Sequence, residues 1–265
     1  MIVRSPDGTP INAETYGEGS PALVVVPGAL STQGTWKAAA QLLSTGRTVL
    51  VLDRRGRGES GDAPAYTPER EVEDVLAFLR ALGQPTDLIG HSSGALLAVQ
   101  AAQRAPAALR RLVLYEPPVY FAGSDGVPAD LPERLDALLA AGDRAAALEM
   151  FLREGPRVPD QQLIEMRADP SWPARVAMAH TVAREASIQR GFDAAPAELR
   201  RVGVPTLMLM GGESPRRMRA GAEGIAARIP GCATHILRGQ QHSGMRTNPV
   251  SFSEAVDGFL RASTP

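Results

Sequence analysis

The chain has 265 residues, is 44% hydrophobic and carries a formal net charge of −1 at pH 7. A chain of this length can bury a large core, and the balanced charge offers no basic patch for nucleic acid. Its single cysteine, Cys232, excludes an intrachain disulfide and a cysteine-rich zinc site.

The N-terminus and the distribution of charge bear on location and partners. Residues Met1–Asp7 lack the apolar core of a signal peptide, and no apolar run is long enough to span a membrane. We therefore expect a cytoplasmic protein with a small-molecule substrate and with neither a nucleic-acid nor a membrane partner. Lys37 is the single lysine, a bias that suits a GC-rich bacterial genome. The oligomeric state is left open, a homodimer included.

Strand and helix patterns alternate along the first part of the chain. Asp7-Gly8 predicts a hairpin turn between two short strands, and the continuous apolar run Ala22–Val26 is typical of a central strand covered on both faces. A helix is expected over Pro68–Leu82, because its apolar residues recur on one helical face. The other expected elements are Met1–Arg4, Ile11–Tyr16, Gln33–Ser44, Thr48–Leu52, Pro85–Ile89, Ala95–Ala102 and Leu112–Tyr115.

Between Pro117 and about Arg200 the strand pattern disappears. Helical periodicity there predicts helices near Leu131–Leu139, Arg144–Arg153, Gln161–Ala168 and Trp172–Arg190. Beyond it we expect the strands Val204–Met210 and Thr234–Leu237 and helices near Arg216–Ile229 and Val250–Ala262. The order predicts an α/β fold with a mostly parallel eight-stranded sheet, formed by residues 1–116 and 201–265. Residues 117–200 are predicted to form a helical cap inserted after the sixth strand.

The most informative motif is Gly90-His91-Ser92-Ser93-Gly94. G-x-S-x-G is common by chance, but a strand before it and a helix directly after it are the context of a nucleophile elbow. Glycines at positions 90 and 94 remove the Cβ atoms that would clash where strand and helix pass close together. The motif therefore predicts Ser92 as a nucleophile; an ordinary Gly-rich turn is the alternative.

Four stretches together resemble the α/β-hydrolase fold superfamily, in the serine-nucleophile branch with a helical cap that includes enol-lactonase-like and esterase-like proteins. They are the elbow, Pro27–Leu30 after the third strand, the D-x-R-G-x-G-x-S stretch Asp53–Ser60, and Gly239–His242. Most members carry His-Gly where this chain has Pro27-Gly28. The resemblance implies that the backbone N–H groups of Ala29 and Ser93 form an oxyanion hole.

A serine nucleophile needs a base, and the chain has four histidines. His242 follows the last strand, in the chain order serine, acid, histidine that is typical of this fold. We expect His91 to pack away from the site and His235 to face the surface or pack. For His180 we expect a solvated position in the cap, with contact to the substrate as the alternative. His242 is therefore the predicted base.

Two glutamates compete for the third position of the triad. The superfamily mostly carries its acid in the loop after the seventh strand, where Ser214 stands in the usual aspartate position and Glu213 comes one residue earlier. Glu116 follows the sixth strand, as in a group of haloalkane dehalogenases, and would lie at the catalytic edge of the sheet. We favour Glu116 and retain Glu213 as the alternative.

Serine at position 92 argues against the halide- and epoxide-cleaving relatives that use aspartate. We expect a serine hydrolase that cleaves an ester, lactone or related acyl bond of a small molecule through an acyl-enzyme, without a metal or an organic cofactor. A cofactor-free lyase, cyclase or isomerase with His242 as a proton shuttle is the alternative, and a non-catalytic binding protein is a third hypothesis. Candidate substrate-binding residues are Leu30 and Trp172, with Arg157, Arg175 and Arg184 as possible carboxylate binders.

Overall fold

The structure is a computed structural model that describes residues 1–121 and 126–262. Its strands are β1 (Ile2–Arg4), β2 (Pro10–Tyr16), β3 (Leu23–Val26), β4 (Val49–Leu52), β5 (Thr86–His91), β6 (Leu109–Tyr115), β7 (Thr206–Gly211) and β8 (Ala233–Leu237). They form one eight-stranded sheet in the order β1-β2-β4-β3-β5-β6-β7-β8. The β1–β2 and β2–β4 pairs are antiparallel and all later pairs are parallel. The predicted fold class is therefore confirmed.

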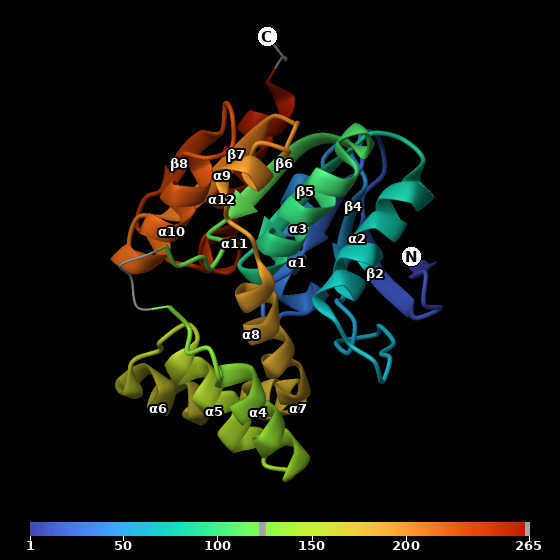
Figure 1. The fold of residues 1–265 in the computed structure, drawn as a ribbon. Helices are drawn as coiled ribbons and strands as arrows, with labels where there is room; N and C mark the ends of the chain where they lie inside the picture. The colour runs from blue at the N-terminus through green and yellow to red at the C-terminus, as the bar shows by residue number, and fades with distance from the viewer. Residues whose placement is uncertain (122–125, 263–265) are drawn as a thin grey trace.

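Helices cover both faces of this sheet (Figure 1). On one face pack α1 (Gln33–Leu43) and α12 (Pro249–Arg261). On the other pack α2 (Pro68–Leu82), α3 (Ser93–Arg104) and α10 (Arg216–Ala226). The central strands are buried along their whole length, which explains why their sequences are continuous apolar runs rather than alternating ones.

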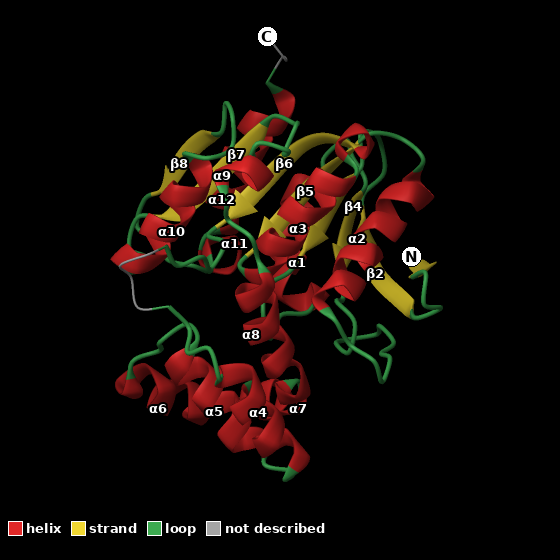
Figure 2. Ribbon diagram, viewed as in Figure 1, coloured by secondary structure: helices red, strands yellow, loops and turns green. Residues whose placement is uncertain are grey.

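The segment between β6 and β7 contains only helices and loops in its described part (Figure 2). Its elements are α4 (Leu131–Ala140), α5 (Arg144–Glu154), α6 (Asp160–Ala168), α7 (Trp172–Ala177), the 3₁₀ turn η2 (Ala179–Thr181), α8 (Val182–Gly191) and α9 (Pro196–Leu199). We call this the helical segment. Helices α4 to α7 form a separate lobe with its own hydrophobic cluster, whereas α8 runs from that lobe to α2 and α3 (Figure 1).

The single helix expected over Trp172–Arg190 is wrong, because η2 divides it into α7 and α8. The backbone N–H of Thr181 donates to the carbonyl oxygen of Met178 at 3.0 Å, which is the i→i−3 bond of a 3₁₀ turn and not the i→i−4 bond of an α-helix. Beyond this turn, α8 contacts α2 and α3. Residues 122–125 of the predicted cap and 263–265 of the predicted core lie outside the described residues.

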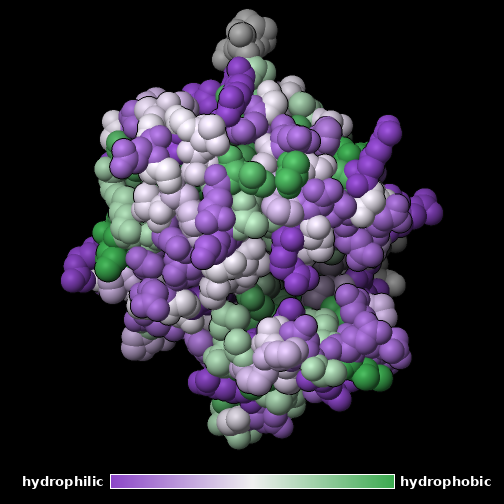
Figure 3. Space-filling view, turned by 180° about the vertical axis from the view of Figure 1, so that it is seen from behind, coloured by the Kyte–Doolittle hydropathy of each residue, from purple (hydrophilic) through white to green (hydrophobic). Residues whose placement is uncertain are grey.

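The surface seen in Figure 3 is mostly hydrophilic, and hydrophobic residues lie on it in small, separate groups. Some of them are visible in the constriction between the large lobe of the sheet and the lobe of the helical segment (Figure 3). Among the described residues, no helix combines the length and the apolar character needed to cross a membrane.

Candidate active site

Ser92 occupies the turn between β5 and α3. Its φ of 53° lies in the left-handed region that non-glycine residues rarely adopt. A Cβ atom on Gly90 would lie 2.5 Å from Cα of Ala95, and one on Gly94 would lie 2.3 Å from the carbonyl oxygen of Val26. Both glycines are therefore needed for the close approach of strand and helix, as the sequence predicts. The serine stands on a strained turn at the carboxyl edge of the sheet.

Glu116 follows β6 directly and holds His242. Its φ of 45° is also left-handed, and its side chain is fully buried. Carboxylate oxygen Oε2 lies 2.7 Å from Nδ1 of His242, and Oε1 accepts the backbone N–H of Gly211 at 2.7 Å. Two bonds to one buried carboxylate fix its orientation, and through it the orientation of the imidazole. The contact that we expected between Glu116 and His242 is therefore present.

The strand register brings the serine and this glutamate together. In the parallel β5–β6 pair, His91 lies opposite Tyr115, so the residues that follow them, Ser92 and Glu116, leave the sheet side by side. The backbone N–H of Ser92 donates to the carbonyl oxygen of Tyr115 at 2.9 Å. His242 reaches the same edge on the loop that follows β8.

The alternative acid, Glu213, lies on the surface in the loop after β7. Its backbone N–H donates to the carbonyl oxygen of Gln240 at 2.9 Å. Ser214, which stands at the usual aspartate position, is buried, and its hydroxyl has no hydrogen-bond partner among the described residues. The carboxylate at Nδ1 of His242 belongs to Glu116 and not to Glu213.

Two buried side chains hold the loop that carries His242. Nε2 of His91 lies 2.8 Å from the backbone carbonyl oxygen of His242, and the two imidazole centroids are 4.5 Å apart. The hydroxyl of Tyr115 donates to the carbonyl oxygen of Gln241 and accepts the N–H of Gly244 at 3.1 Å. Because a carbonyl oxygen only accepts, His91 carries its proton on Nε2.

The expectation that His91 packs away from the site is therefore wrong in part. His91 is buried as expected, but the C-terminal loop closes over the elbow and places His242 against its ring. Burial, and then the neighbouring His242, hold the pKa of His91 well below its usual range. His91 is thus a neutral support beneath the predicted base.

The loop after β3 lies against the elbow. A Cβ atom on Gly28 would lie 2.8 Å from Cβ of Ser92, so only glycine permits this approach. Ala29 and Leu30 also pack against the hydrophobic cluster of the helical segment, as Trp172 does. The loop therefore contacts both the elbow and that cluster. The roles of Ala29 and Ser93 as oxyanion donors, and of Leu30 and Trp172 as pocket residues, stay predictions.

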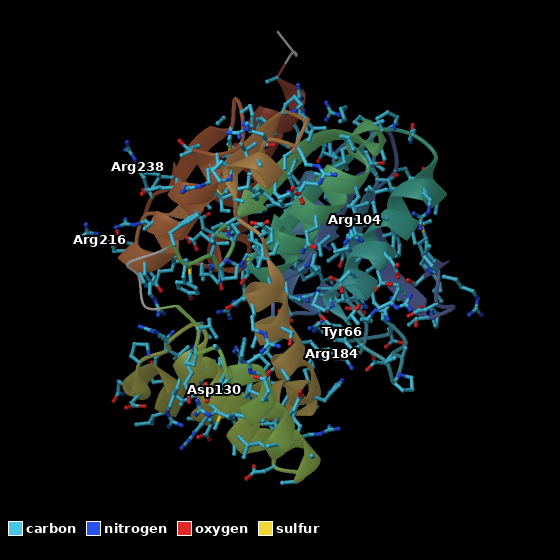
Figure 4. The ribbon with its side chains drawn as sticks, viewed as in Figure 1. Tyr66, Arg104, Asp130, Arg184, Arg216 and Arg238 are labelled. Carbon is cyan, nitrogen blue, oxygen red and sulfur yellow. The ribbon has the colours of Figure 1, made fainter. Side chains whose placement is uncertain are left out.

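The remaining histidines and the cap arginines have other surroundings. His180 is half-buried rather than solvated, because Nε2 lies 2.9 Å from the carbonyl oxygen of Gly56 and so joins the helical segment to the loop after β4. His235 is exposed on β8. Both terminal nitrogens of Arg184 bond to Asp62 at 2.8 Å, and its guanidinium covers the ring of Tyr66 (Figure 4). Arg184 is thus engaged within the protein.

One feature of the site has no signal in the sequence. Arg54, Arg57, Glu71 and Glu185 form a cluster of buried charges that touches Ser93. Its members come from a loop and two helices far apart in the sequence, so no local pattern points to it. Within residues 1–121 and 126–262, no group of three or more His, Cys, Asp or Glu side chains is placed to hold a metal ion.

The chain is similar to known proteins over most of its length. The alpha/beta hydrolase family model matches residues 23–255. A solved alpha/beta hydrolase from Sphaerobacter thermophilus is 38% identical, with a TM-score of 0.90 over 98% of this chain and 100% of that one. The N-formylmaleamate deformylase of Pseudomonas putida is 40% identical over 129 residues, so the match spans about half of that relative (48%). The 2-hydroxymuconate semialdehyde hydrolase of Pseudomonas putida is 28% identical, covering 94% of this chain and 90% of the relative. The chain belongs to the alpha/beta hydrolase family and is a hydrolase.

Proposed function

We propose that this hydrolase cleaves an acyl bond of a small molecule through a covalent acyl-enzyme on Ser92. The observation that carries the proposal is the 2.7 Å contact between Oε2 of Glu116 and Nδ1 of His242, at the sheet edge where Ser92 stands on a nucleophile elbow. A carboxylate at Nδ1 fixes the tautomer that bears its proton there. It leaves Nε2 as the nitrogen that takes the serine proton.

The reaction then runs in two halves. The hydroxyl oxygen of Ser92 attacks the carbonyl carbon while its proton passes to Nε2 of His242, and the backbone N–H groups of Ala29 and Ser93 stabilise the negative charge on the former carbonyl oxygen. When this intermediate collapses, the leaving group takes the proton from the imidazolium. Water, deprotonated by the same imidazole, then attacks the acyl-enzyme. When this second intermediate collapses, the acid leaves and the oxygen of Ser92 takes the proton back from the imidazolium.

The proposed substrate is an ester, a lactone or a related acyl compound. Two relatives are named as a deformylase and as a semialdehyde hydrolase, so cleavage at a carbonyl carbon of a small molecule is consistent with both names. Leu30 and Trp172 adjoin the hydrophobic cluster of the helical segment and are proposed to contact the acyl group. No metal or organic cofactor enters this reaction.

A fluorophosphonate probe and rapid quenching test the proposal. Intact-protein mass spectrometry should show one probe per chain on Ser92, and quenched turnover of a short-chain aryl ester should show the mass of the acyl group at the same residue. Ser214→Ala, which removes a nearby buried hydroxyl, should label like the wild type. Turnover without an acyl adduct would favour the proton-shuttle chemistry instead, and absence of labelling would contradict the proposal.

A further inference from the structure

The buried charge cluster consists of Arg54 and Arg57 from the loop after β4, Glu71 from α2 and Glu185 from α8. Nε and Nη2 of Arg54 donate to the two carboxylate oxygens of Glu71 at 2.6 and 3.0 Å, and Nη1 lies 3.1 Å from Oε1 of Glu185. Arg57 donates to Glu185 and lies 3.4 Å from Glu71. Two positive and two negative groups balance, which is the condition for burying charge at all.

The same guanidinium touches both walls of the proposed oxyanion hole. Nη1 of Arg54 donates to the hydroxyl of Ser93 at 3.0 Å and to the carbonyl oxygen of Pro27 at 3.4 Å. Ser93 is the residue after the nucleophile, and Pro27 begins the loop that carries Ala29. The guanidinium is planar and rigid, so the fork to Glu71 also fixes the direction in which Nη1 points.

Stability alone does not explain this arrangement. Well-packed apolar residues of similar volume are often as stabilising as buried ion pairs, because removing charges from water is costly. Arg54 also stands at a variable position of the D-x-R-G-x-G-x-S stretch, next to Arg55, so the fold marker does not require it. Its contacts with Ser93 and Pro27 supply a reason for its presence.

We propose that Arg54 is a positioning residue that holds the two walls of the oxyanion hole at a fixed separation, and that Glu185 makes this geometry depend on α8 of the helical segment. The inference rests on the proposed serine-hydrolase function. Loss of these contacts would leave the Ser92, His242 and Glu116 side chains in place but displace the N–H groups of Ala29 and Ser93.

Three variants test the inference in order of increasing perturbation: Ser93→Ala, Glu185→Gln and Arg54→Lys. We expect kcat to fall about 10- to 100-fold in Glu185→Gln and Arg54→Lys, and less in Ser93→Ala, because small displacements of oxyanion donors slow the reaction strongly. KM should stay nearly constant. Affinity for a boronic acid, which forms a charged tetrahedral adduct, should fall in proportion to kcat/KM, because both depend on the same donors.

Arg55→Lys is the matched control. Arg55 lies in the same loop and is equally buried, but it pairs with Asp74 at 2.8 and 2.7 Å and with Asp7 at 2.9 Å. This variant should lose stability and keep its kcat and boronate affinity per folded molecule, measured after circular dichroism has established the folded fraction. Adding Ser93→Ala to Arg54→Lys should lower kcat little more than Arg54→Lys does alone, because both substitutions remove the same contact between Arg54 and Ser93.

Failure of the positioning role and failure of the proposed function give different results. Unchanged kcat and boronate affinity in folded Ser93→Ala and Glu185→Gln would overturn the positioning role, even if Arg54→Lys fails to fold. An equal fall in Arg55→Lys would also overturn it, since the effect would then be general. Full activity of Ser92→Ala would instead refute the proposed function on which the inference rests.

Discussion

Two neighbouring strands, β6 and β7, end at the edge of the sheet where His242 lies, and an acidic residue follows each of them. After β6, Glu116 is buried with a left-handed backbone and has both carboxylate oxygens bonded. After β7, Glu213 is exposed and Ser214 has a buried hydroxyl without a partner among the described residues. The N–H of Gly211, at the end of β7, bonds to Glu116. The ends of both strands therefore meet at the carboxylate of Glu116, and this carboxylate contacts His242.

Removing the serine or the histidine should have the largest effect. The choice between Glu116 and Glu213 affects catalysis only if His242 is the base that deprotonates Ser92. Ser92→Ala and His242→Ala should each lower kcat by up to roughly 10⁶-fold, since triad members act as a unit. Steady-state ester hydrolysis by variants that keep the wild-type circular dichroism spectrum is the measurement. Near-wild-type turnover by either variant would show that the substituted residue is not catalytic, and the question of its acid would then not arise.

Amidating each acid in turn sharpens the comparison directly. Glu116→Gln should lower kcat by up to ~10⁴-fold, because an amide at Nδ1 favours the wrong imidazole tautomer. Glu213→Gln is the matched control and, as a surface change, should alter kcat by no more than about twofold. The opposite ranking of the two rates would reverse the assignment of the acid.

The neighbouring strand β5 ends at His91, and this residue extends the comparison to the pH dependence of stability. The pKa of His91 is depressed in the folded protein, so below about pH 6.5 the unfolded chain binds a proton that the folded protein does not. The free energy of unfolding should therefore fall as the pH drops from 7 to 5, with His91 contributing up to about 2 kcal/mol.

Urea unfolding of the wild type and of His91→Gln at pH 5, 6 and 7 measures that contribution. The variant should lose less stability between pH 7 and pH 5, whatever its absolute stability. His235→Gln removes an exposed imidazole and should keep the wild-type pH dependence. Parallel pH dependences for the wild type and His91→Gln would contradict a lowered pKa of His91 in the folded protein.

The smallest expected effect is a partial recovery of kcat when a carboxylate is removed after β6 and introduced after β7. A Cβ atom on Gly211 would lie 2.6 Å from the hydroxyl of Ser214, so residue 214 lies next to the N–H that Glu116 uses. Ser214→Asp in a Glu116→Gln background should recover about tenfold in kcat, because adjacent sites are coupled. Ser214→Ala in the same background should recover nothing. Equal rates for the two double variants would show that the β7 loop no longer reaches His242.

The regular elements could be predicted where their own residues carry the signal. Helix α2 runs over Pro68–Leu82 as predicted, because it has a proline in its first turn, apolar residues at helical spacing and Gly83 with a φ of 65° at its end. The break between α7 and α8 was missed, since periodicity does not reveal that Thr181 bonds back to Met178. Helix period alone cannot locate such a turn.

The same distinction holds for the site. Ser92, Glu116 and His242 could be proposed because each follows a strand directly or stands in a recognisable motif, and the strand order then brings them to one edge. Arg54 and Glu185 are 131 positions apart, and only tertiary packing places them in contact. His91 was misjudged because the sequence does not say which loop covers the elbow.

The most direct test of the assignment is the proton on Nδ1 of His242, observed by NMR in protein labelled with ¹⁵N-histidine. In the wild type and in Glu213→Gln, we predict a strongly downfield Nδ1–H resonance coupled to the nitrogen of His242, as a buried bond to a carboxylate produces. In Glu116→Gln that resonance should be lost or shift markedly upfield. Its persistence in Glu116→Gln together with its loss in Glu213→Gln would contradict the assignment of Glu116 as the acid.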